Sequence, residues 1–167
     1  FGMSTRFIEL AGEINTSMPA YVVDKTSCGL NNNGKPINGS RILILGISYK
    51  KNVDDMRESP AVEIMQLLIN KGAKIDYSDP YFPSFPTMRK YDISLESIKL
   101  NSINIKTYDA IIIATDHDLF DYKMIEDNSN LIIDTRGRMN PSKKIIRAWY
   151  FNKFYLGFLQ NISFQYF

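Results

Sequence analysis

The sequence predicts an α/β fold in which helices flank a parallel sheet. From about residue 41, strand-like and helix-like segments alternate along the chain, which is the order typical of parallel sheets. The strand-like segments include the continuous apolar run RILILG at 41–46, and such a run indicates a strand buried on both faces. Polar residues cluster where these segments end. Together these features predict a Rossmann-like domain preceded by a helical arm.

The first part of the chain predicts the helical arm. Apolar residues recur at helical spacing from Phe7 to Ile14, and Pro19 indicates a break or a restart of the helix. The Asn- and Gly-rich segment TSCGLNNNGKPINGS that follows predicts a linker. The predicted segments are the arm at 1–25, the linker at 26–40, the domain at 41–148 and a tail at 149–167.

The predicted domain begins with a strand, and a helix with clear end signals follows. Ser59 is a plausible N-cap, Pro60 fits the first helical position, and Gly72 marks the end of this helix. The elements expected in order are a strand at 41–46, a helix at 59–72, strands at 73–80 and 108–116, a short helix near 119–127 and a strand at 130–136. With four strands in place, the core should be complete near Met139.

Composition and charge argue against several classes of protein. A net charge of +2, with no Lys/Arg run longer than two residues, does not suit a nucleic-acid partner. No run of 18 uninterrupted apolar residues occurs and the start lacks a signal-peptide pattern, so we expect a cytoplasmic protein with no membrane partner. The single cysteine, Cys28, excludes an internal disulfide.

The loop after the first strand, GISYKKNVDDMRESP at 46–60, is the main candidate site. It has no G-x-G-x-x-G pattern, so its backbone cannot approach a pyrophosphate as a dinucleotide-binding loop does. It offers instead the cations Lys50, Lys51 and Arg57 near a helix N-terminus, which suits a phosphate or a diphosphate. Alternatively, three acidic residues of the same loop neutralise these cations in a solvated loop. The charge pattern alone leaves both interpretations open.

Other polar residues follow later strands. His117, the only histidine, could be a metal ligand or a base, but it lacks a metal-site spacing, and we favour a residue of the turn after a strand. Cys28 lies in the predicted linker with no histidine near it in sequence, so we expect no nucleophile there. Arg136 and Arg138 follow the last predicted strand, where an anion clamp is slightly favoured over surface charge.

Four blocks of the sequence resemble the UDP-glucose/GDP-mannose dehydrogenase family. They are, in order, RFIELAGEINTSMP, GISYKKNVDDMRESP, IIIATDHDLFDY and IIDTRGRM, and the resemblance covers roughly residues 3–140. The branch most similar to them oxidises UDP-N-acetylglucosamine or UDP-N-acetylmannosamine to uronic acids. The resemblance implies the C-terminal, UDP-binding domain of an NAD-dependent UDP-sugar 6-dehydrogenase of polysaccharide biosynthesis. Residues 1–25 would then end a central helical region through which the family dimerises.

The resemblance also implies roles for individual residues. Tyr49 and Lys50 would contact the nucleotide sugar, Arg136 would belong to the same substrate site, and Arg57 would reach the NAD cofactor. The family's N-terminal G-x-G-x-x-G domain and its Gly-rich catalytic cysteine motif do not occur in these 167 residues, and Cys28 does not take that role. We therefore expect no catalytic residue and no metal ligand here. Partners would be a UDP-sugar, the missing domains of the same enzyme and a second copy in a homodimer.

A receiver-like phospho-acceptor signalling module is the alternative function. Asp54, Asp55 and Thr115 superficially suggest such a site. Against it, the acidic pair lies eight residues beyond Gly46 rather than at the strand tip, and Arg136 stands where a lysine is required.

The tail at 149–167 is rich in aromatic residues and does not resemble the polar C-terminus of the dehydrogenase family. We expect it to be dispensable for the fold and to promote self-association.

Overall fold

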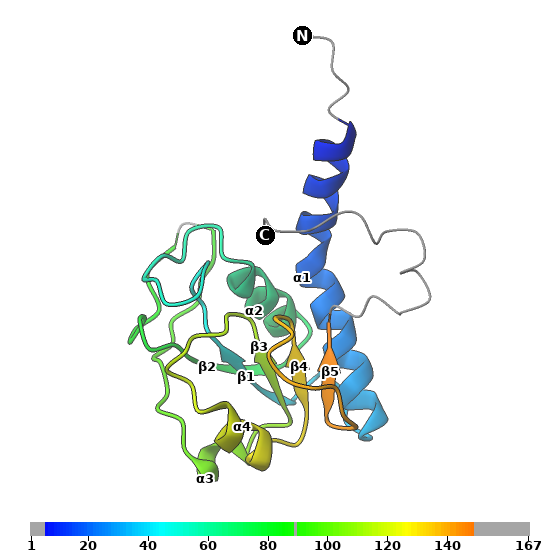
Figure 1. Cartoon of the computed structure of the whole chain (residues 1–167), viewed down its shortest axis with the longest axis vertical. Coiled ribbons are helices and arrows are strands. Elements are labelled where there is room, and N and C mark those ends of the chain that lie inside the picture. The colour runs from blue at the N-terminus through cyan, green and yellow to red at the C-terminus, as the bar shows by residue number, and fades with distance from the viewer. Residues whose placement is uncertain (1–5, 89, 149–167) are drawn as a thin grey trace.

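A computed structural model describes residues 6–88 and 90–148 of the chain. Five parallel strands form one sheet in the order β2-β1-β3-β4-β5 (Figure 1). The strands are β1 (Arg41–Leu45), β2 (Lys74–Ser78), β3 (Ala110–Ile113), β4 (Ile132–Asp134) and β5 (Ile145–Arg147). This arrangement confirms the predicted α/β, Rossmann-like class. The expectations for the tail at 149–167 lie outside the described residues.

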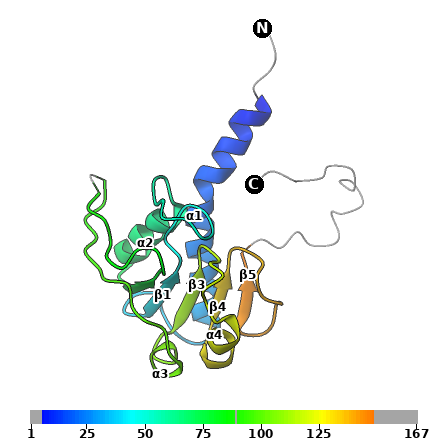
Figure 2. The same cartoon turned by 60° about the vertical axis from the view of Figure 1, so that its left-hand side comes forward.

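Helices cover both faces of the sheet (Figures 1 and 2). They are α1 (Arg6–Asn32) and α2 (Pro60–Asn70) on one face, and α3 (Ser102–Ile105) and α4 (Tyr122–Asn128) on the other. Successive residues of β1 point to opposite faces: Ile42 and Ile44 join the core under α1 and α2, whereas Leu43 and Leu45 join the core under α3 and α4. Apart from Arg41 at the start of β1 and Asp134 at the end of β4, the central strands β1, β3 and β4 are apolar, because neither face of the sheet meets water there.

The start of α2 has the predicted cap. The Ser59 side chain accepts a hydrogen bond from the Ala61 backbone nitrogen at 3.3 Å, and Pro60 occupies the first helical position. Gly72 adopts a left-handed backbone with φ +83° just after the helix. These features confirm the helix bounds read from the sequence to within about two residues.

The first helix is longer than predicted. No break occurs at Pro19, which lies inside α1 and is itself buried. A proline in a helix interior costs about 3 kcal/mol. The turns that follow offset this cost because they bury Val22, Val23 and Leu30 in the core beside α2 and the sheet.

The predicted linker at 26–40 is also helical in its first part, because α1 runs to Asn32. The prediction of a linker rested on the Asn- and Gly-rich composition of this segment and is wrong for residues 26–32. Gly29 sits on the buried side of the helix, where an added Cβ would lie 2.9 Å from the Leu131 side chain and 3.0 Å from that of Ile146. Glycine therefore serves here to let α1 approach the sheet rather than to loosen the chain. The non-helical connection is the shorter segment 33–40.

The sheet does not end where the sequence analysis expects. A fifth strand, β5, pairs in parallel with β4 beyond Met139. Ile145 and Ala148 are buried, so the core extends to the last described residue instead of closing near Met139. β5 is only three residues long, which is too short for a recognisable alternation pattern.

The N-terminal half of α1 stands clear of the sheet (Figures 1 and 2). Ile8, Leu10 and Ile14 are exposed on this half, whereas the later turns of the helix pack on the domain. No helix in the part of the chain that the structure describes is long and apolar enough to cross a membrane.

Candidate functional site

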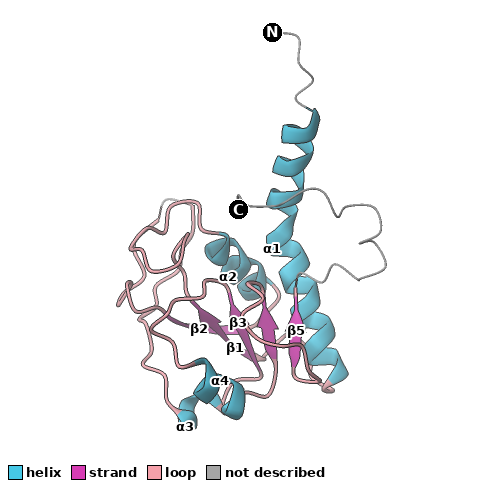
Figure 3. Ribbon diagram, viewed as in Figure 1, coloured by secondary structure: helices cyan, strands magenta, loops and turns pink. Residues whose placement is uncertain are grey.

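Loops gather at the edge of the sheet where the parallel strands end, as the sequence predicts (Figure 3). Three of them carry the candidate residues: the loop after β1 at 46–59, the loop after β3 at 114–121 and the loop after β4 at 135–144. In open α/β sheets this edge is where ligands bind.

Gly46 sets the path by which the chain leaves β1. Its backbone has φ +76°, and its nitrogen donates to the Ser78 carbonyl oxygen at 2.9 Å. A Cβ at this position would lie 2.3 Å from the Thr115 carbonyl oxygen, which is a backbone atom of the neighbouring loop. The Thr115 hydroxyl then donates to the Ser48 carbonyl at 2.6 Å. Only glycine allows the two loops to run this close together.

Asp79 holds the base of the loop after β1. Its buried carboxylate accepts hydrogen bonds from the backbone nitrogens of Ile47 at 2.7 Å, Ser48 at 3.2 Å and Tyr81 at 2.8 Å. Tyr81 donates to Oδ1 of this carboxylate, and Ile47 and Ser48 donate to Oδ2. The Ser48 hydroxyl and the His117 Nε2 also lie 3.1 Å from Oδ2. Burial raises the pKa of Asp79, but the hydrogen bonds from His117, Tyr81 and Ile47 outweigh it and leave the pKa below its usual value.

His117 is fully buried at the centre of these loops. Its Nδ1 accepts a hydrogen bond from the Asn52 backbone nitrogen at 2.9 Å, and its ring packs against those of Tyr81 and Phe120. The sequence analysis places His117 in the turn after a strand, which agrees with its position in the loop after β3. It does not predict that the side chain is buried. Among the described residues no group of three or more His, Cys, Asp or Glu side chains could hold a metal ion.

The tip of the loop after β1 is tied to the loop after β3. Asn52 has a left-handed backbone with φ 59°. Its Nδ2 donates to the Asp118 carboxylate at 2.7 Å, and its Oδ1 accepts from the Asp118 backbone nitrogen at 3.0 Å. Lys51 forms an ion pair with the same carboxylate at 2.6 Å. The charge of Lys51 is therefore paired with a carboxylate of the same chain, in a contact at the protein surface.

Tyr49 and Lys50 lie on the exposed side of this loop. The Lys50 Nζ is 5.6 Å from the centroid of the Tyr49 ring, a cation–π distance. Among the residues that the structure describes, no carboxylate pairs with Lys50. Of the three cations predicted on this loop, Lys50 is thus the one that keeps an unneutralised charge.

Arg57 is neutralised within the loop. Its Nε and Nη2 donate to the two carboxylate oxygens of Asp55 at 3.1 and 2.9 Å. The Arg57 guanidinium lowers the pKa of Asp55 to about 2. The Arg57 side chain is nevertheless 89% exposed, so water surrounds the pair. For this residue the structure shows the arrangement that the solvated-loop alternative describes.

Arg136 belongs to a tightly built turn after β4. The buried carboxylate of Asp134 accepts hydrogen bonds from the backbone nitrogens of Arg136 at 2.9 Å, Gly137 at 2.8 Å and Met139 at 2.8 Å. The Arg136 Nε lies 3.6 Å from the Asp116 Oδ1. The Asp134 carboxylate thus fixes the backbone of the turn, while the Arg136 side chain leans toward the loop after β3.

The loop after β3 is the common support of the predicted cations. Asp118 binds the loop that carries Lys50, and Asp116 contacts Arg136. The Arg138 guanidinium carbon instead lies 4.8 Å from the centroid of the Tyr122 ring, so Arg138 makes a cation–π contact with the first residue of α4. The structure therefore joins the Lys50 loop and Arg136 through one short segment, residues 116–118.

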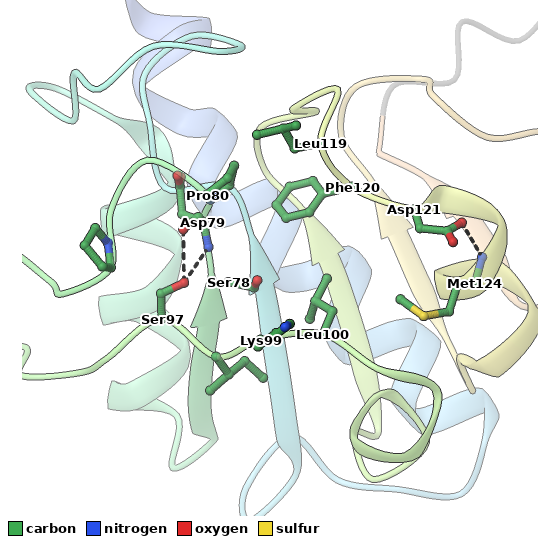
Figure 4. A pocket seen from close by; sticks show the side chains of 12 residues that line it. Ser78, Asp79, Pro80, Ser97, Lys99, Leu100, Leu119, Phe120, Asp121 and Met124 are labelled. Carbon is green, nitrogen blue, oxygen red and sulfur yellow. Dashed lines mark hydrogen bonds between the residues drawn. The ribbon is translucent and has the colours of Figure 1, made fainter.

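A cavity of about 490 Å³ lies on the α3 and α4 side of this edge (Figure 4). Its lining includes Pro80, Lys99, Leu100, Phe120 and Met124. None of the four residues predicted to bind substrate or cofactor contributes to it. The predicted residues lie instead on the open surface of the loops.

Sequence analysis singled out neither Asp79 nor Asn52. Asp79 carries a weak signal, because it lies at the end of a predicted strand and precedes Pro80. Asn52 carries another, since asparagine tolerates a left-handed backbone better than other non-glycine residues do. Neither signal identifies the partner, which lies far away in sequence.

Comparisons with known proteins match residues 43–141 to the UDP-glucose/GDP-mannose dehydrogenase family, UDP binding domain. The UDP-N-acetyl-D-mannosamine dehydrogenase of Methanococcus maripaludis is 37% identical over 117 residues, which cover 70% of this chain and 25% of that protein. The NDP-N-acetyl-D-galactosaminuronic acid dehydrogenase of Ralstonia solanacearum is 31% identical over 145 residues, covering 84% and 32%.

The fold matches solved structures of the same kind. The NDP-N-acetyl-D-galactosaminuronic acid dehydrogenase of Methanosarcina mazei Go1 aligns with a TM-score of 0.67 at 25% identity, over 87% of this chain and 31% of that one. The chain spans only between a quarter and a third of the length of these proteins. The receiver-like alternative finds no support in these matches. The chain belongs to the UDP-glucose/GDP-mannose dehydrogenase family and contains that family's UDP binding domain.

Proposed function

We propose that residues 41–148 bind the UDP part of a nucleotide sugar at the edge where the strands end. The observation that carries this proposal is the position of Lys50. It is exposed beside Tyr49 on a loop with a fixed path, and it has no carboxylate partner among the described residues, whereas Lys51 and Arg57 are neutralised. A diphosphate is the ligand that such a cation suits, and the family match to a UDP binding domain supports the same choice.

Arg136 is the second cation of the proposed site. Its contact with Asp116, at 3.6 Å, is longer than an ordinary hydrogen bond, so a phosphate can compete for the guanidinium. The turn that Asp134 builds limits how far Arg136 can move. Because Asp116 and Asp118 support Arg136 and the Lys50 loop from one segment, both cations can face a single ligand.

The whole protein would act as an NAD-dependent UDP-sugar 6-dehydrogenase that makes UDP-uronic acids for polysaccharide biosynthesis. The dehydrogenases to which the chain is similar support this class of reaction. The oxidation of a primary alcohol to a carboxylate removes two hydrides in turn, and NAD is the acceptor that this family implies.

The described residues do not form a cradle for the whole NAD molecule. The turn from β1 to α2 has one glycine where a dinucleotide fingerprint needs three, and the Ser59 side chain already caps the first turn of α2. NAD would thus be held mainly by residues outside this chain, with Arg57 at most touching its edge. Arg57 would have to give up part of its bidentate contact with Asp55.

The projecting half of α1 would belong to the central region of the enzyme, with residues 1–25 as its end. Leu10 and Ile14, which are exposed and one helical turn apart, give this half an apolar strip, which a neighbouring domain or a second copy of the protein would cover. A homodimer of the full enzyme is consistent with that surface.

Isothermal titration calorimetry with UDP tests the proposed site. A charge-assisted contact to phosphate contributes about 1.5–3 kcal/mol, so Lys50→Ala should weaken UDP binding about tenfold or more. Lys74→Ala is the matched control, because Lys74 is an exposed lysine at the start of β2, on the opposite edge of the sheet. Equal affinities for the Lys50→Ala variant and the unmodified chain would remove Lys50 from the site.

A further inference from the structure

We propose that His117 is a positioning residue that sets the conformation of the loop carrying Lys50. It does so as a neutral imidazole whose Nδ1 holds the backbone N–H of Asn52. The effect on ligand binding rests on the proposed function, whereas the effect on the loop stands independently of it. The two carboxylates beside His117 in sequence, Asp116 and Asp118, serve other contacts and do not bind its ring.

The hydrogen bonds of His117 determine which ring nitrogen carries the proton. A backbone N–H can only donate, so the Nδ1 that lies 2.9 Å from the Asn52 nitrogen must be unprotonated. The ring proton therefore sits on Nε2, which donates to the Asp79 carboxylate at 3.1 Å. Each nitrogen thus has one partner and one role, and exchanging the roles would set two donors against each other.

The surroundings leave the imidazole no other orientation. The ring is completely buried, and the rings of Tyr81 and Phe120 lie with their centroids 5.0 and 5.6 Å from its own. The Tyr122 hydroxyl donates to the His117 carbonyl oxygen at 2.8 Å and anchors the backbone. The position of Nδ1 is therefore set by β2, α4 and the loop after β3 together.

The partner of Nδ1 is the point at which the ligand loop turns back. Asn52 is one of only two non-glycine residues in the described chain with positive φ, at 59°. It follows Lys50 by two residues. The hydrogen bond from its N–H to His117 fixes the backbone, and the bonds from its side chain to Asp118 fix its lateral position. Loss of the backbone bond would free the segment that presents Lys50.

Two substitutions separate the two roles of the ring. In His117→Gln, the amide nitrogen can reach the Nε2 position and still donate to Asp79, but no acceptor remains for Asn52. In His117→Asn, the side-chain oxygen occupies the Nδ1 position and can accept from Asn52, while the contact with Asp79 is lost. A residue that acts only by filling the core would lose at least as much in His117→Asn as in His117→Gln, because the smaller Asn leaves the larger cavity.

Amide hydrogen exchange measured by NMR on the ¹⁵N-labelled chain provides the main test, together with a UDP titration. We expect the Asn52 amide to exchange about tenfold faster in His117→Gln than in the unmodified chain, and UDP binding to weaken severalfold. His117→Asn should restore most of the protection and of the affinity. Equal exchange rates in the Gln variant and the unmodified chain, or equal losses in both variants, would overturn the proposal.

A measurement on the unmodified chain covers the case in which a variant does not fold. Long-range ¹H–¹⁵N spectra of the His117 ring should show the Nε2–H tautomer with an unprotonated, hydrogen-bonded Nδ1. An Nδ1–H tautomer would overturn the proposal. If the unmodified chain does not bind UDP, the proposed function fails, but the Asn52 exchange and the tautomer still decide the role of His117.

Discussion

The Asp79 carboxylate lies 2.7 Å from the backbone nitrogen of Ile47, so the end of β2 holds the first turn of the loop that follows β1. Ile47 directly follows Gly46, where the chain leaves its strand. The bond therefore acts where a small change in backbone direction would be carried along the loop toward Lys50. The loop that carries Lys50 therefore depends for its shape on two neighbouring strands, and not only on its own residues.

Removal of the Asp79 carboxylate should destabilise the domain strongly. Asp79→Ala leaves the backbone N–H groups of Ile47 and Ser48 without their acceptor in a buried setting. Each buried unsatisfied donor costs about 1–3 kcal/mol, so we expect a loss of roughly 3 kcal/mol or more in the free energy of unfolding. Urea unfolding measures it. Asp92→Ala, at an exposed aspartate, is the control and should stay within about 0.5 kcal/mol.

Acid should destabilise the domain partly through the same carboxylate. The pKa of Asp79 is lower in the folded chain than its ordinary value of 3.8. Its contribution is therefore complete above the unfolded pKa and is lost as the pH falls through the lower folded pKa. The urea concentration at the unfolding midpoint, measured at several pH values between 7 and 2.5, should decrease once the pH drops below about 4. In Asp79→Asn this decrease should be less steep.

The comparison with the Asn variant is needed because Glu63, Asp109 and Asp118 also have lowered pKa values and contribute to the same acid transition. Parallel pH profiles for the two proteins would contradict a stabilising role for the ionised Asp79.

Gly46→Ala should be far more costly than an alanine at another left-handed glycine. At Gly46 the new Cβ would meet the Thr115 carbonyl oxygen at 2.3 Å, in addition to the strain of φ +76°. The two effects together should cost about 2–5 kcal/mol of unfolding free energy. Gly34→Ala is the control, since Gly34 has φ +70° but nothing within 4 Å, and should cost only about 1 kcal/mol. Similar costs at both sites, measured by urea unfolding, would argue against the close approach of the two loops.

The fifth strand should be indispensable. A chain that ends at Met139 loses β5 and uncovers the edge of β4, including Ile132 and Ile133, which pair with it. We expect this chain to lose its cooperative thermal transition, whereas a chain that ends at Ala148 keeps it. Circular dichroism melts of the two chains provide the measurement. A cooperative melt of the shorter chain, near the temperature of the longer one, would show that the core is complete without β5.

The local part of the architecture could be predicted from the sequence because its signals are short-range. β1, β3 and β4 lie in apolar runs of the sequence, β2 is closed by Asp79 and Pro80, and the start of α2 follows from Ser59 and Pro60. The family also follows from contiguous blocks, because the residues that identify it are read in order along the chain. The exposure of Lys50 could also be expected from the sequence, because the residues around it in the loop are polar.

Only the tertiary structure decided which of the polar residues are buried and which partners they have. Gly29 looks like a linker residue until the approach of Leu131 shows why a helix needs it, and three-residue β5 becomes a strand only because β4 lies beside it. His117 and Asp79 meet across 38 positions of sequence, and Asn52 reaches His117 across 65. Such contacts depend on the direction in which each loop leaves the sheet. That direction cannot be derived from the spacing of residues along the chain. The sequence by itself therefore determined four of the five strands and the family, and the folding of distant loops onto one another determined which cation of the loop after β1 has no carboxylate partner among the described residues.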